Sequence, residues 1–253
     1  MESSNLIAKQ LQKEAIILQQ KKRKQRLIKF FIIFGLLILI ILGLAFHFSS
    51  FSKIASINIH EGNIYSKNEL ENSLLLKKND SLLFVDKNKI FNKDLAFIDS
   101  VNVKVDFFKR SVDINIKEKE VIGYFLTSKI NVFSLDGSIA IIDDNKTALI
   151  ANKVRVSNFD KNTLLKLIDS IKNSDPIFYN NISEIILDPK SYDESYLKLI
   201  MQDGVIVYTS IHSFESLKIN LYKDMLNLLS DEYRCIKYDV FMKNAYAFKC
   251  PTK

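Results

Sequence analysis

The chain has 253 residues, of which 47% are hydrophobic and 26% are charged, a balance typical of a folded protein with one large or two small domains. Six Gly, three Pro and two Cys exclude the collagen-like, disulfide-dense and wholly disordered classes. Residues 1–29 carry eight basic and two acidic side chains, which is nearly all of the net charge of +7. Such a basic segment is typical of either nucleic-acid binding or the flank of a membrane span.

The residues that follow decide between these two interpretations. Residues 30–46 contain no charged or polar side chain, and with His47 and Phe48 the apolar segment has 19 residues. A helix of that length spans about 28 Å, the thickness of one bilayer core. We therefore predict a transmembrane helix over residues 29–48 rather than a buried core helix or a signal peptide, whose small-x-small cleavage site is missing. Nucleic-acid binding is rejected, because the remaining body is close to neutral.

The charge asymmetry also predicts the orientation of the span. By the positive-inside rule, the basic tail of residues 1–28 is cytoplasmic and the C-terminal body is extracytoplasmic. Ile7, Leu11 and Leu18 lie at helical spacing, so the tail is equally consistent with an amphipathic helix on the inner surface and with a solvated segment.

The first part of the body, residues 49–120, reads as a β-α-α-β-β unit. Residues 54–59 alternate with the period of a strand, and Ser66 with Glu69 forms a capping box that begins a helix running to about Leu75. Asp86 is predicted to cap a second helix through about Phe97. Two further strands are predicted over residues 101–105 and 112–116.

The second part, residues 121–253, is predicted to consist mainly of hairpins. Asp136-Gly137 and Asp203-Gly204 each separate two apolar strands, a strong hairpin signal. A third hairpin at the end of the chain has Ile236, Tyr238, Val240 and Met242 on one face, a turn at Lys243-Asn244, and Tyr246 and Phe248 returning. Two helices interrupt these strands, one capped by Asp160 and one capped by Ser213 with an apolar stripe reaching Leu228.

Together these patterns carry a resemblance. The run from Ile57 through Gly62 and the capping box, followed by residues 81–86 and the paired strands, resembles a POTRA domain. With one span before it, and a Leu197 to Val207 hairpin and a Lys218 to Leu229 helix after it, the chain resembles the FtsQ/DivIB family of bacterial cell-division proteins. The resemblance covers about residues 30–250 and implies an α+β fold: a transmembrane helix, a POTRA domain and a mainly antiparallel β domain with two helices.

The resemblance also implies a function. Members of this family are non-enzymatic scaffolds of the division septum that bind small bitopic coiled-coil proteins of the FtsB/DivIC and FtsL type and help to recruit septal peptidoglycan synthesis. The last hairpin is where a partner would add a strand. Carried over to this sequence, the partner-binding residues are Tyr238, Asp239, Val240, Phe241, Met242, Tyr246 and Phe248. After Val240 the chain departs from the family pattern of an Arg and a Gly-containing turn.

Other functions find less support in the residues. The chain has no G-x-S-x-G, P-loop or H-E-x-x-H motif, and His212-Ser213 is more simply a loop residue before a helix cap, so we expect no enzyme, no cofactor and no metal. Cys235 and Cys250 lie in the exported part, where a disulfide is permitted but not required. The alternative function is a POTRA-containing transport or secretion component, which would usually carry an outer-membrane barrel after the POTRA domain.

Overall fold

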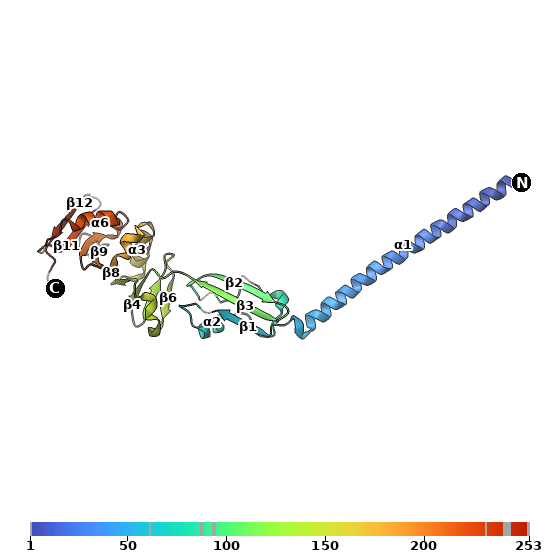
Figure 1. Cartoon of the computed structure of the whole chain (residues 1–253), viewed down its shortest axis with the longest axis horizontal. Coiled ribbons are helices and arrows are strands. Elements are labelled where there is room, and N and C mark those ends of the chain that lie inside the picture. The colour runs from blue at the N-terminus through green and yellow to red at the C-terminus, as the bar shows by residue number, and fades with distance from the viewer. Residues whose placement is uncertain are drawn as a thin grey trace. The chain divides into compact units, whose positions relative to one another are not determined.

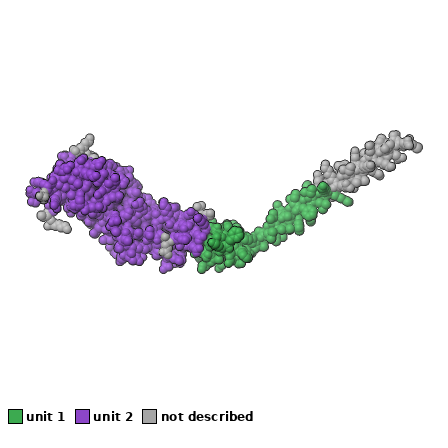
Figure 2. Space-filling model, in the orientation of Figure 1, with its two compact units in different colours: residues 1–57, 76–86, 105–112 green, residues 58–75, 87–104, 113–253 purple. Residues whose placement is uncertain are grey.

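The computed structural model describes residues 2–60, 62–86, 89–92, 95–230, 232–239 and 244–251, with side chains from Arg23 onward apart from those of residues 25 and 26. The chain forms two compact units (Figure 2). Unit 1 comprises residues 1–57, 76–86 and 105–112, and unit 2 comprises residues 58–75, 87–104 and 113–253.

Unit 1 contains one long helix, α1, from Glu2 to Phe48 (Figure 1). Its part from Leu27 to Phe48 is apolar and long enough to cross a membrane, and none of it is buried by other described parts of the chain. The helix continues without a break into the basic tail. Residues 2–29 are rich in Lys, Gln and Leu, which have high helix propensity, and several of their Ile and Leu residues lie at helical spacing. The 3-10 helices η1, Ser50–Ser52, and η2, Leu82–Phe84, complete the helical elements of this unit.

A three-stranded sheet with the order β1-β3-β2 follows. Its strands are β1, Ser56–His60, β2, Ile98–Asp106, and β3, Ser111–Glu118, which confirms all three predicted strands. Helix α2, Lys67–Ser73, begins with the predicted capping box: the Ser66 hydroxyl accepts from the Glu69 N–H, and the Glu69 carboxylate accepts from the Ser66 N–H at 2.7 Å. The β-α-α-β-β prediction is therefore correct for the strands and for the first helix.

The predicted helix over residues 86–97 is wrong for the residues that the structure describes there. Residues 89–92 are non-helical, because their backbone is paired with the end of α2: the Leu75 N–H donates to the Ile90 carbonyl at 2.8 Å and the Asn92 N–H to the Ser73 carbonyl at 2.9 Å. Ile90 and Phe97 are buried as expected, but they reach the core from non-helical backbone. Tertiary pairing thus overrides a helical spacing.

The largest element of unit 2 is a nine-stranded sheet with the order β12-β11-β10-β9-β8-β7-β4-β5-β6. Five of the eight pairings among these described strands are antiparallel, and three are parallel: β10 with β11, β4 with β7, and β7 with β8. The strands are β4, Gly123–Leu126, β5, Ile130–Phe133, β6, Ile139–Ile142, β7, Val154–Ser157, β8, Ile182–Leu187, β9, Tyr196–Met201, β10, Ile206–Ser210, β11, Cys235–Asp239, and β12, Asn244–Phe248.

The two Asp-Gly hairpins form as predicted. β5 pairs with β6 around Asp136-Gly137, and β9 pairs with β10 around Asp203-Gly204. Gly137 has φ 84° and Gly204 has φ 85°, which lie in the left-handed region that only glycine adopts without strain. The glycine of each turn is therefore required by its backbone conformation.

The helices that follow β7 share one hydrophobic core with the large sheet. Helix α3, Lys161–Asn173, begins at the predicted cap, where the Asp160 carboxylate accepts from the Thr163 N–H at 2.9 Å. Two short helices were not predicted: α4, Pro176–Asn180, and α5, Ile211–Phe214. Asp175 caps α4 and Pro176 occupies its first turn, a signal that was readable in the sequence.

The single helix predicted after Ser213 is divided. Ser210 caps α5, and a separate helix α6 runs from Ile219 to Leu226. The Ile219 N–H, which a continuous helix would direct to the Glu215 carbonyl, instead donates to the carboxylate of Asp175 at 2.9 Å. A side chain distant in sequence therefore begins a new helix.

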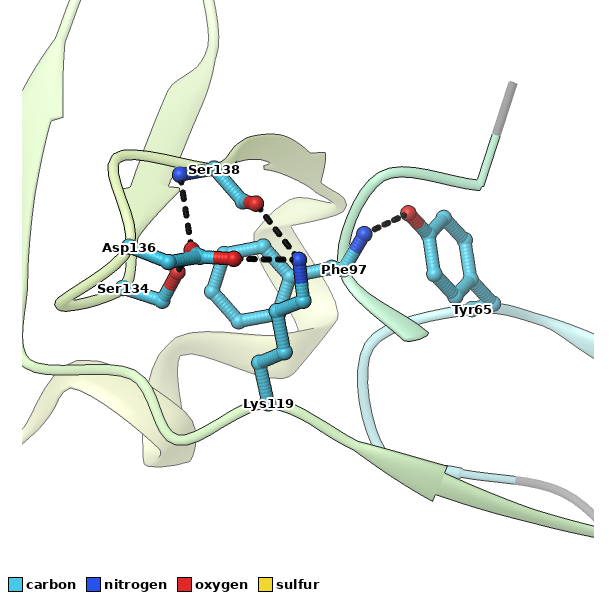
Figure 3. Close-up of polar contacts among 6 residues, drawn as sticks. All are labelled: Tyr65, Phe97, Lys119, Ser134, Asp136 and Ser138. Atoms are coloured by element: carbon cyan, nitrogen blue, oxygen red, sulfur yellow. Dashed lines mark hydrogen bonds and ion pairs between the residues drawn. The ribbon is translucent and has the colours of Figure 1, made fainter. Parts of the chain in front are cut away.

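A polar cluster joins the segment after β3 to the turn between β5 and β6 (Figure 3). Lys119 Nζ lies 2.6 Å from Asp136 Oδ2 and 2.7 Å from Ser138 Oγ, and the carboxylate of Asp136 also accepts from the hydroxyl of Ser134. Burial by itself raises the pKa of the Asp136 carboxyl, but the hydrogen bonds from Lys119 and the two serines outweigh burial and hold its pKa well below its usual range. The turn of the β5–β6 hairpin is thereby tied to the chain that leaves β3.

Candidate partner-binding edge

The terminal hairpin of β11 and β12 forms one edge of the nine-stranded sheet. β11 pairs with β10 on one side and with β12 on the other, whereas β12 pairs with β11 alone among the described residues. Five residue pairs join the two strands, from Cys235 opposite Phe248 to Asp239 opposite Asn244. One side of the β12 backbone is therefore available for pairing with a further strand.

The predicted site residues fall into three groups. Tyr238 and Asp239 lie on β11, and Tyr246 and Phe248 lie on β12. Val240, Phe241 and Met242 lie outside the described residues. Asn244, predicted as part of the turn, is the first residue of β12. The structure thus brings four of the seven residues together in one hairpin.

The two faces of this hairpin have different surroundings. Ile236 and Tyr238 point into the main core beneath the helices, and the Tyr238 hydroxyl lies 3.1 Å from the hydroxyl of Ser216. Their partners on β12 are Ala247 and Ala245, which are partly buried. Because alanine side chains are short, they would leave space on this face beside a strand that paired with β12. Larger apolar side chains of the added strand could fill that space.

The opposite face carries a row of aromatic rings that the sequence analysis did not identify. Successive ring centroids are 6.1 Å apart for Tyr196 and Tyr208, 5.6 Å for Tyr208 and Phe248, and 6.1 Å for Phe248 and Tyr246. Tyr192 extends the row, with its centroid 5.9 Å from that of Tyr196. The period-two alternation of β9 and β10 indicates which of their side chains share a face. The row of rings becomes visible only when the register between the strands is known.

A lysine lies within this aromatic row. Lys237 Nζ is 5.5 Å from the ring centroid of Tyr192 and 5.7 Å from that of Tyr196, and Lys237 is the cross-strand neighbour of Tyr246. Burial raises the pKa of both Tyr196 and Tyr208 above the usual value. Both hydroxyls therefore stay protonated at neutral pH, and the face is aromatic and cationic next to the free edge.

A disulfide bond joins Cys235 and Cys250, 15 residues apart, which resolves the pairing that the sequence left open. It connects the first residue of β11 to the segment immediately after β12, and both sulfurs lie in a small cluster with Tyr196, Tyr208 and Phe248. The edge strand is thus held by three attachments: the ladder to β11, the packing of Phe248, and this covalent bond.

Among the described residues, no group of three or more His, Cys, Asp or Glu side chains is placed to hold a metal ion. Ser213, half of the one Ser-His neighbour pair, is buried, and its N–H donates to the Ser210 hydroxyl at 3.3 Å. Both residues of the pair therefore lie inside α5, which is capped by Ser210, and the expectation that His212 is a loop residue before a cap at Ser213 is wrong. What the hairpin offers a ligand is free backbone flanked by aromatic side chains.

Comparison with known proteins identifies relatives along most of the chain. The chain is 24% identical to the cell division protein DivIB of Erysipelothrix rhusiopathiae over 227 residues, which cover 87% of this chain and 82% of the relative. It is 26% identical to DivIB of Listeria monocytogenes, with 77% and 73% of the two chains covered, and 26% identical to DivIB of Bacillus subtilis, with 87% and 83% covered.

A solved structure gives a weaker likeness. The major extracytoplasmic domain of the cell division protein DivIB from Geobacillus stearothermophilus matches 45% of this chain and 99% of its own length, at 16% identity and a TM-score of 0.35. No family model matches the chain.

Proposed function

Because the chain belongs to the FtsQ/DivIB family, whose relatives compared above are cell-division proteins, we propose that it is a division scaffold that captures a partner by strand addition. It has a role in cell division and is a single-pass membrane protein with an extracytoplasmic body. The proposal concerns how this body works: the β12 edge binds other membrane-anchored division proteins.

The free edge of β12 is the observation that carries this proposal. Main-chain hydrogen bonds to an added strand would supply affinity, and the side chains on the two faces of β12 would supply selectivity. Tyr246 is 49% exposed and lies at the end of the aromatic row, so it would contact the alternate side chains of an incoming strand. No group in the hairpin needs to change its ionisation state for such binding.

The resemblance to the family supports a proposal for the partners. Small bitopic coiled-coil proteins of the FtsB/DivIC and FtsL type are the proposed ligands, at the division septum, where the scaffold helps to recruit or regulate peptidoglycan synthesis. Anchoring in the same membrane would confine both proteins to one plane and raise their effective concentration. The proposed organisation is a tail of residues 1–28, a span of 29–48, a POTRA domain of 49–120 and a β domain of 121–253.

The test is capture of partners by full-length protein solubilised from dividing cells, with bound proteins identified by mass. We expect small bitopic coiled-coil proteins with the intact chain and their loss from a variant without residues 246–253. That deletion also removes Cys250, so Tyr246→Ala is the sharper variant, because it leaves the disulfide in place.

The matched control for this variant is Tyr192→Ala. Tyr192 belongs to the same aromatic row and is 69% exposed, but it lies outside β12. Reduced capture by Tyr246→Ala with normal capture by Tyr192→Ala supports the edge. Equal capture by wild type and Tyr246→Ala, together with capture by the 246–253 deletion, contradicts it, and exported client proteins in place of coiled-coil partners would favour the transport function.

A further inference from the structure

Unit 1 exposes a patch of large apolar side chains at and beyond the C-terminal end of the membrane-spanning helix. It consists of one residue at the end of α1, one in η1, two in η2 and two in the turn between β2 and β3. The side chain of Phe108 is fully exposed and that of Phe84 is 74% exposed. We call this set the phenylalanine patch: Phe48, Phe51, Leu83, Phe84, Phe107 and Phe108.

Backbone hydrogen bonds hold the loops of this patch together. The Ile54 N–H donates to the Asp80 carbonyl at 2.9 Å, and the Asn79 N–H donates back to the Ile54 carbonyl at 2.9 Å. The Ala55 N–H donates to the Arg110 carbonyl at 2.8 Å. Because Ile54 is buried at the centre of these bonds, the exposure of the phenylalanines is a property of an ordered surface.

The patch is attached to the last turn of the membrane span. The ring of Phe84 lies 5.7 Å from that of His47, and the buried hydroxyl of Ser52 donates to the His47 carbonyl at 2.7 Å. Since the apolar part of α1 ends at Phe48, these contacts place Phe84 at the level where the hydrocarbon core meets the headgroups. Aromatic side chains concentrate at this level in membrane proteins.

The charges around the patch favour an anionic surface. The loops of unit 1 carry five basic residues, Lys53, Lys77, Lys78, Lys109 and Arg110, against Asp80, Asp86 and Asp106. Two of these carboxylates are engaged by backbone: Asp80 accepts from the Lys77 N–H at 2.7 Å, and Asp106 accepts from the Phe108 and Lys109 N–H groups at 2.9 Å each. The Arg110 guanidinium donates to the Ser50 carbonyl at 3.0 Å and lies 6.0 Å from the Phe51 ring.

We propose that the phenylalanine patch inserts into the interfacial layer of the same bilayer that α1 spans, with its lysines against anionic lipid headgroups. This lipid contact is separate from the β12 edge and does not depend on the proposed function. Apolar loops interleaved with cations are the composition of surfaces that bind a membrane interface. A second contact beside the span would restrict the rotation and tilt of unit 1 at the membrane surface.

The absence of Trp from the sequence makes a direct test simple, because one substitution gives a unique fluorophore. Phe84→Trp and Phe108→Trp are made separately in the full-length chain and reconstituted in lipid nanodiscs that hold one copy each. The lipids carry bromine on the upper acyl chain, which quenches Trp by contact. Tyr192→Trp, an exposed ring in unit 2, is the matched control.

We expect blue-shifted emission and strong quenching at positions 84 and 108, and unquenched emission at position 192. Replacing anionic lipid by neutral lipid should weaken the quenching at position 108. Emission at positions 84 and 108 that matches a solvent-exposed Trp, with no quenching, overturns the proposal. The same variants are also measured in discs that hold two copies. Blue-shifted emission that appears only in these discs, without bromine quenching, would show that the phenylalanine patch binds a second copy of the chain and would also overturn the proposal.

Discussion

The two Asp-Gly hairpins and the terminal hairpin belong to one sheet but are held in different ways. In β5–β6 and β9–β10, the turn itself is anchored by a side chain from elsewhere: Lys119 binds Asp136, and the Tyr222 hydroxyl donates to Asp203 at 2.8 Å. The terminal hairpin is anchored at its open end by the disulfide of Cys235 and Cys250. The two Asp-Gly hairpins are therefore held at their turns by hydrogen bonds, whereas the terminal hairpin is held at its open end by a covalent bond.

This difference bears on function. β12 is short, carries two alanines and has one paired side among the described residues, so its own packing contributes little to stability. An edge strand that accepts a partner, as proposed above for β12, cannot be covered by its own chain. The disulfide restricts the freedom of β12 without covering the free edge of its backbone.

The largest effect on this comparison is expected from Ile236→Ala. Ile236 is fully buried in β11, the strand that supports β12, and the truncation should lower the free energy of unfolding by about 2–5 kcal/mol. Urea unfolding of the full-length protein in mild detergent measures this loss. If Ile236→Ala lowers the free energy of unfolding by no more than Tyr246→Ala does, β11 and β12 are equally supported by their packing.

Removal of the disulfide comes next. Replacing both Cys235 and Cys250 by Ser reopens a loop of 15 residues, which should cost about 3 kcal/mol. We expect amide hydrogen exchange to accelerate first in β12, while the β9–β10 amides stay protected. Uniform acceleration through the whole sheet would contradict the separate anchoring of this hairpin.

A smaller effect is expected from Tyr222→Phe, which removes the anchor of the β9–β10 turn and should cost about 1 kcal/mol. Burial, and then the hydrogen bond to Asp203, raises the pKa of Tyr222 above its usual value. The stability that this tyrosine contributes is therefore complete below about pH 10 and is lost as the pH rises through the raised pKa. The free energies of unfolding of wild type and Tyr222→Phe should therefore differ fully below about pH 10 and converge as the pH rises above it.

The smallest effect is expected at the β5–β6 turn, where the Asp136 pKa is lowered. Its contribution is present above the unfolded pKa of about 3.9 and is lost as the pH falls through the lower folded pKa. Asp136→Asn should therefore reduce the melting temperature near neutral pH and make little difference in strong acid. Since this carboxylate is half exposed, solvent screens much of the effect. If Asp136→Asn lowers the melting temperature equally near neutral pH and in strong acid, the loss of stability comes from the turn conformation and not from the charge of the carboxylate.

Features with local causes were predictable from the sequence alone. The apolar span, the Ser66–Glu69 capping box and the Asp160 cap depend on residues within a few positions of one another, and each is present in the structure. The two Asp-Gly hairpins are of the same kind, because a short turn with glycine at positive φ sets the register of the strands beside it.

The sequence by itself therefore determined the membrane span, the order of the main strands and the position of the last hairpin. Only the tertiary structure decided that Asp175 starts α6, that residues 89–92 are non-helical and paired with the end of α2, and that Cys235 pairs with Cys250. It also decided the parallel pairing of β10 with β11, which leaves β12 at the edge of the sheet. These features arise from contacts between residues far apart in the chain, whose partners no local pattern specifies.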